Sequence, residues 1–151
     1  MKIGAIKIIS FLGLLLIGVV AVCYLATPMS LVFGLKNYAM QRQRQLIYEI
    51  DHATLAAEAR AFADQRRSRP GFVDSEPQIL WWGDPDIPAS LRVLKPTSIG
   101  IFQNRIQLEF GGPPLHYGIV IFNTDLEGGG TKKLAKGVWF YSENGRYPDP
   151  S

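Results

Sequence analysis

An uncharged apolar stretch near the N-terminus, residues 8–26, constrains this chain more than any other feature of its sequence. Its 19 residues include no Asp, Glu, Lys or Arg. As an α-helix they would extend over about 28 Å, which matches the hydrocarbon core of a bilayer. The sequence therefore predicts an N-terminal transmembrane helix within a membrane anchor of residues 1–35, followed by one small domain of residues 36–151.

A cleaved secretory signal is the alternative for this stretch, because Lys2 and Lys7 precede it. The apolar run is longer than the roughly 7 to 15 residues of such a signal. This length favours a retained anchor. A short tail ahead of an anchor most often stays in the cytoplasm, so we expect the domain on the periplasmic side of a bacterial inner membrane.

Basic residues gather next to the apolar stretch. Residues 36–69 contain seven basic and four acidic residues, whereas residues 70–151 contain seven basic and nine acidic residues. Lys36, Arg42 and Arg44 are expected to face anionic lipid headgroups. The slightly acidic C-terminal part argues against a nucleic-acid partner. The lipid bilayer and a protein are the expected partners.

Residues 37–67 contain no Gly or Pro and predict one long amphipathic helix. Its apolar stripe follows spacings of three and four residues, and a polar face lies opposite. Pro70 and Gly71 end the helix. The stripe consists of Ile47, Ile50, Thr54, Ala57 and Ala61, with Leu46, Ala53 and Phe62 beside them.

The remaining chain predicts an antiparallel sheet. A Pro-rich segment, residues 70–97, contains an extended piece at 79–82 and a short helix at 88–94. From residue 98 the apolar period becomes two, which predicts strands at 98–101, 106–110, 117–122 and 137–141. We therefore expect an α+β fold in which the long helix packs on a four-stranded antiparallel β-meander within residues 98–141. A polar tail, residues 143–151, follows.

The two histidines are the candidates for acid–base or metal chemistry. His52 lies on the expected helix and His116 at the start of the third strand. Packing of the helix on the sheet could bring them together, with Glu109 or Asp51 completing a site. Neither histidine belongs to a known ligand pattern, so structural roles are favoured, and no metal or cofactor is expected.

Aromatic residues of the fourth strand indicate a second kind of site. Trp139 and Tyr141 point opposite to Val138 and Phe140, because side chains alternate along a strand. One pair therefore faces away from the core, where it is either free for a protein partner or, in the preferred interpretation, covered by the Pro-rich segment. The candidate binding residues are His52, His116, Trp139 and Tyr141.

The order of apolar segment, amphipathic continuation and antiparallel strands resembles a type IV pilin or pseudopilin. The resemblance implies assembly into a filament through the N-terminal helices. Gly4-Ala5 stands at the place of the pilin cleavage junction, and Ile9 at the place of its glutamate. Residues 90–141, with their segments 106–112, 116–118 and 137–141, are similar to a pattern in uncharacterised bacterial proteins, which implies a compact domain.

These observations favour a single-pass, membrane-anchored binding or structural protein of the bacterial envelope. We expect no enzymatic activity, because the chain has no Gly-x-Ser-x-Gly motif and its one cysteine, Cys23, lies in the apolar stretch. A pilin-like subunit is one alternative. A small enzyme that uses His52 and His116 is the other.

Overall fold

The computed structural model describes residues 23, 32–73, 76–111, 115–124, 130–143, 145 and 148. The chain divides into two compact units, Met1–Tyr38 and Ala39–Ser151. In the first unit, residues 32–38 are helical and their side chains are exposed. All described strands belong to the second unit.

The predicted N-terminal transmembrane helix is not observed. No helix in the described part of the chain is long and apolar enough to cross a bilayer. The helical residues 32–48 include Lys36, Arg42 and Arg44, and these charges lower the hydropathy of the segment. Residues 8–26, on which the prediction was based, lie outside the described residues except for Cys23.

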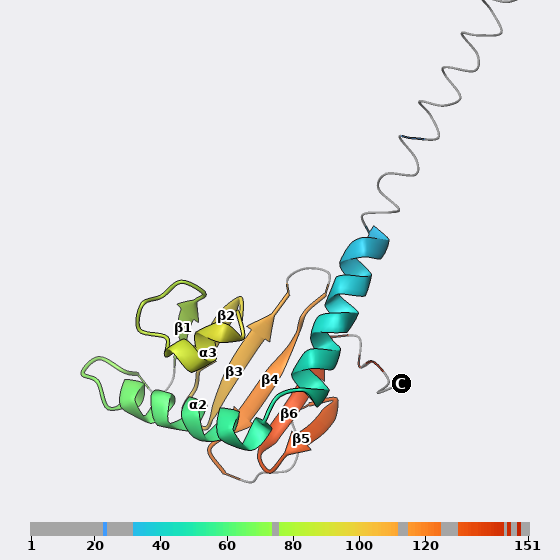
Figure 1. Ribbon diagram of the computed structural model, residues 1–151. Helices are drawn as coiled ribbons and strands as arrows, with labels where there is room; N and C mark the ends of the chain where they lie inside the picture. The colour runs from blue at the N-terminus through green and yellow to red at the C-terminus, as the bar shows by residue number, and fades with distance from the viewer. Residues whose placement is uncertain are drawn as a thin grey trace, which may run out of the picture. The chain divides into compact units, whose positions relative to one another are not determined.

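The prediction of one long helix over residues 37–67 is wrong, because the chain breaks at residues 49–51. Residues 39–48 are helical, and a separate helix, α2, extends over His52–Arg67. Asp51 caps α2 by accepting hydrogen bonds from the backbone N–H groups of Ala53 and Thr54. The Thr54 hydroxyl and these backbone bonds lower the pKa of Asp51. Figure 1 shows that α2 starts in a new direction.

The break changes which residues of α2 face the core. Of the residues of the predicted stripe that lie on α2, Ala53, Thr54, Ala57 and Ala61 are exposed, and only Phe62 is buried. A new helix has its own phase, so a stripe counted through the break selects the wrong face. The buried residues are Leu55, Ala56, Ala59, Phe62, Ala63 and Arg66.

The sheet has six antiparallel strands instead of the predicted four. The strands are β1 (Gln78–Trp81), β2 (Ser98–Ile101), β3 (Arg105–Phe110), β4 (Tyr117–Phe122), β5 (Lys132–Ala135) and β6 (Val138–Ser142). Their order in the sheet is β1-β2-β3-β4-β6-β5. β6 therefore pairs with β4, and β5 lies at the edge beyond it. β5 was missed because its four residues include two lysines and show no apolar alternation.

The Pro-rich segment contributes two of these elements. β1 overlaps the extended piece expected at 79–82 but begins and ends one residue earlier, and the short helix α3 covers Ala89–Val93 after Pro88. A turn closes between the strands predicted at 98–101 and 106–110, with the Phe102 amide donating to the Arg105 carbonyl at 2.9 Å. Of the predicted tail, the structure describes residues 143, 145 and 148.

The core lies between the sheet and one layer of helices. In Figure 1, α2 and α3 lie in front of the strands. Leu91 of α3, Phe62 of α2 and Leu46 of the helical residues 39–48 are buried in the same apolar cluster as the inward residues of the sheet. The sheet contributes, among others, Ile99, Ile101, Ile106, Leu108, Phe110, Tyr117, Ile119, Ile121, Val138 and Phe140.

Candidate functional site

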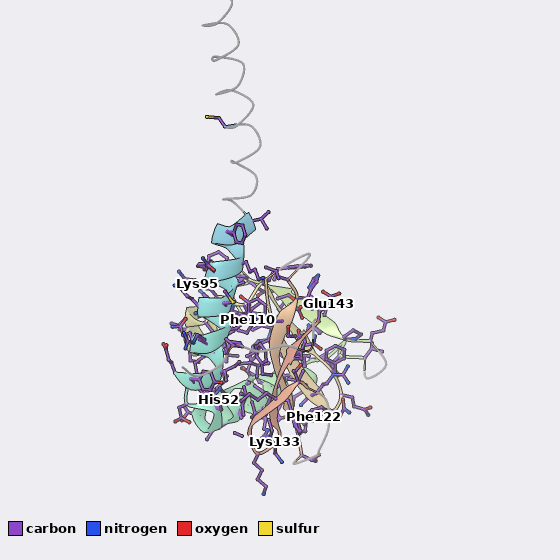
Figure 2. The ribbon with its side chains drawn as sticks, turned by 90° about the vertical axis from the view of Figure 1, so that its right-hand side faces the viewer. His52, Lys95, Phe110, Phe122, Lys133 and Glu143 are labelled. Carbon is purple, nitrogen blue, oxygen red and sulfur yellow. The ribbon has the colours of Figure 1, made fainter. Side chains whose placement is uncertain are left out.

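The face of the sheet that points away from the helices, called the open face below, carries a mixed polar and aromatic surface. Along β3 the side chains alternate between buried and half-buried. Val120 and Phe122 of β4 are buried but lie outside the core cluster. Figure 2 shows His52 on the helix side of the strands and Phe122 on the other side. The strand register places on the open face Arg105, Gln107, Glu109, Val120, Phe122, Trp139 and Tyr141.

Four side chains on the open face form a hydrogen-bonded group, the Glu109 cluster: Gln107, Glu109, His116 and Tyr141. The Gln107 amide donates to Glu109 Oε2 at 3.1 Å and to the Tyr141 hydroxyl at 2.9 Å. The Tyr141 hydroxyl donates to the same Glu109 oxygen. His116 Nδ1 lies 3.2 Å from Glu109 Oε1. These contacts occupy three of the roughly four acceptor positions of a carboxylate, so Glu109 organises its neighbours and is poorly placed to take a proton from a substrate.

Gly118 makes room for this cluster. It is the register partner of both Glu109 on β3 and Tyr141 on β6. A Cβ atom at this position would lie 2.6 Å from the Tyr141 hydroxyl and would collide with the Leu108 carbonyl oxygen. The missing side chain therefore lets the phenol of Tyr141 extend across Gly118 to Glu109.

A hollow of about 270 Å³ lies beside the Glu109 cluster. Three polar side chains line it, Arg105, Gln107 and Tyr141, and two apolar ones, Val120 and Phe122. All five come from the central strands β3, β4 and β6. Their positions are fixed by the sheet, so a ligand would meet a surface that is already ordered.

Burial of the Tyr141 hydroxyl, followed by its hydrogen bond to Glu109, raises its pKa above that of an ordinary tyrosine. We expect Tyr141 to ionise later than an exposed tyrosine in an alkaline absorbance titration, and the Tyr141→Phe variant to lose this late phase. A raised pKa favours the neutral phenol in the folded state. The contribution of the neutral phenol to the stability of the folded state is therefore complete below about pH 10, the pKa of tyrosine in the unfolded chain. It is lost as the pH rises above that value.

The matched control for this titration is Tyr38→Phe, because Tyr38 is 68% exposed. This variant should keep the late phase. Identical titration curves for Tyr141→Phe and the unmodified protein would contradict the arrangement of the cluster.

The structure places the predicted binding residues in two groups. His116 and Tyr141 belong to the Glu109 cluster, and Trp139 lies on the same face, with its ring 5.7 Å from the Lys133 ammonium. His52 is not brought to them, because its Nε2 atom lies 2.8 Å from the Leu46 carbonyl oxygen among the helices. The pairing of His52 with His116 on which the enzyme alternative depends is therefore not formed.

The basic residues predicted to face a membrane differ in their surroundings. Lys36 is exposed. Arg42 donates to the Leu94 carbonyl oxygen and to the Gln45 side chain, and its guanidinium lies 5.8 Å from the centre of the Phe110 ring. Arg44 is half-buried. At least Arg42 therefore has a structural role in the second unit.

Sequence reasoning missed Arg105 and Gln107 as site residues. Their signal was the polar alternation of β3, where Arg105, Gln107 and Glu109 occupy every position opposite to the core. The half-buried polar side chains of β3 indicate that this face of the sheet is less buried than the core and less exposed than an ordinary solvated surface. Within the described residues, no group of three or more His, Cys, Asp or Glu side chains is placed to hold a metal ion.

Comparison with protein-family profiles, with curated proteins and with solved structures found no match for this chain. Its function is therefore argued from the open face itself.

Proposed function

We propose that this protein is a binding protein and that the open face of its sheet receives a small ligand. The observation that carries the proposal is the hollow of about 270 Å³ between the Glu109 cluster and Arg105. Ligand sites are concave and combine an apolar lining with a few fixed polar groups. Val120 and Phe122 supply the apolar lining here, and Gln107 and Tyr141 supply fixed polar groups.

The hydrogen bonds of the Glu109 cluster support this proposal. Gln107 and Tyr141 are held by each other and by Glu109, so their rotamers are restrained before a ligand arrives. Ordering side chains at a binding site costs about 0.5–1.5 kcal/mol for each immobilised side chain. A surface that is ordered in advance avoids this cost.

A location at the bacterial inner membrane, with the folded unit on the periplasmic side, remains part of the proposal. Its support is the sequence alone: the uncharged run at residues 8–26 and the basic residues that follow it. Cell fractionation tests this part. Recovery of the chain with membranes after an alkaline wash supports it, and release into the soluble fraction contradicts it.

Filling the hollow tests the binding function. In the Val120→Phe variant of the full-length chain, a larger ring replaces a side chain that lines the hollow. We expect small organic molecules that bind the unmodified protein in an NMR screen to lose at least tenfold in affinity. Overpacking costs about 1–3 kcal/mol, so circular dichroism must show that the variant is folded.

Val93→Phe is the matched control, because it adds the same ring at a site on α3 that is 74% exposed. It should bind the same molecules as the unmodified protein. Binding that survives in Val120→Phe, or a screen without any binder, would contradict the proposed function.

A further inference from the structure

Arg105, which lines the hollow, indicates which ligands it accepts. The guanidinium of Arg105 lies over the Phe102 ring, with Cζ 4.3 Å from the ring centre. In the part of the chain that the structure describes, no carboxylate or carbonyl group accepts a hydrogen bond from it. By contrast, Arg42, Arg60, Arg66 and Arg67, which are also half-buried or buried, donate to such groups.

The nearest acid on the same strand does not neutralise Arg105. Glu109 is four residues away along β3, which corresponds to about 13 Å in an extended strand. Its oxygens are engaged by Gln107, Tyr141 and His116. Among the described residues, the hollow therefore has a positive charge at its Arg105 end that no carboxylate neutralises, and a carboxylate beyond its Tyr141 end.

We infer that the hollow binds a small organic monocarboxylate, whose carboxylate pairs with Arg105 and whose apolar part lies on Val120 and Phe122. This inference rests on the proposed function and specifies its ligand class. A guanidinium binds a carboxylate through two parallel hydrogen bonds. The stacking of Arg105 on Phe102 holds the planar group in place while leaving its N–H groups for a ligand.

The charge of Glu109 selects for a single negative charge. One cation lines the hollow, and a second anionic group on the ligand would extend toward Glu109. Like charges repel each other more strongly in a partly buried site than in water, because the effective dielectric constant of the site is lower. Dicarboxylates and phosphate monoesters, which carry close to two negative charges, should therefore bind more weakly than monocarboxylates of the same size.

The test compares matched pairs of small carboxylates and their primary amides, among them benzoate and benzamide, by NMR titration of the full-length chain. The members of each pair have nearly the same shape and differ in charge. We expect the protein to prefer the carboxylates, and Arg105→Gln to lower their affinity at least tenfold while changing that of the amides less than twofold. The preference should weaken as salt is added.

Arg69→Gln is the control, since it removes one positive charge from an arginine that pairs with Asp86 and does not line the hollow. It should keep the preference for carboxylates. Equal binding of carboxylates and amides, or a preference that persists in Arg105→Gln, would overturn the monocarboxylate inference and leave the binding function in place. If no member of the panel binds, both are overturned.

Discussion

The Gly118→Ala variant is expected to lose both stability and the Glu109 cluster. The added methyl group would collide with the Leu108 carbonyl oxygen across the strand pair and would lie 2.6 Å from the Tyr141 hydroxyl. One neighbour is backbone and cannot move without disturbing the β3–β4 ladder. We expect the free energy of unfolding to fall by about 1–3 kcal/mol, as for other overpacked sites. Urea denaturation measures this change.

The same variant should displace Tyr141 from Glu109. The late-ionising tyrosine should then titrate earlier, because its partner and its burial are both reduced. Gly34→Ala is the control, since Gly34 is helical and nothing lies within 4 Å of the added atom. That variant should be as stable as the unmodified protein or slightly more stable. Unchanged stability and an unchanged tyrosine titration in Gly118→Ala would contradict the described packing.

The Phe140→Ala variant is expected to show the largest loss of stability. Phe140 is one of the largest fully buried side chains, and its ring centre lies 6.3 Å from the ring centre of Tyr117. Truncation of a buried Phe leaves a cavity and costs about 3–5 kcal/mol. Small domains are stable by only about 5–15 kcal/mol, so the variant should denature at a much lower urea concentration.

Phe33→Ala removes an equal side chain that is 59% exposed and serves as the control. Its effect should stay within about 0.5 kcal/mol. Since Phe140 and Tyr141 are neighbours on opposite faces of β6, Tyr141→Phe should also be far milder than Phe140→Ala. Comparable losses in Phe140→Ala and Tyr141→Phe would show that the core has been assigned to the wrong face.

The sequence predicted the central strands well because alternation is a local property. Ile106, Leu108 and Phe110 are all buried, and the polar residues between them are half-buried, as a period of two requires. Likewise, Val138 and Phe140 are buried in the core, and Trp139 and Tyr141 lie on the open face. The pattern within one strand therefore fixed which side chains share a face.

Elements that depend on distant partners were harder to predict. β1 and β5 have four residues each, and they are strands because β2 and β6 pair with them. The break before α2 depends on one carboxylate, Asp51, which also fits an ordinary exposed helical position. The membrane-spanning helix was predicted from the hydropathy of residues 8–26, and the helices that the structure describes do not supply it.

The candidate site could be anticipated only in part. Glu109 and His116 were considered together, and the structure brings them within 3.2 Å. The expectation that the Pro-rich segment covers the second face finds no support in its tryptophans, because Trp81 and Trp82 are 68% and 52% exposed. Arg105 could not be singled out, since a sequence does not show whether an arginine meets a carboxylate in the fold.

Chemical-shift mapping tests most directly whether the open face is a binding surface. The measurement records the ¹H–¹⁵N spectrum of the full-length chain while the tightest carboxylate from the panel is added. We expect the largest shifts at the residues that line the hollow, and small shifts in α2 on the opposite face of the sheet. Shifts concentrated in α2, α3 or the edge strands β1 and β5 would contradict the account.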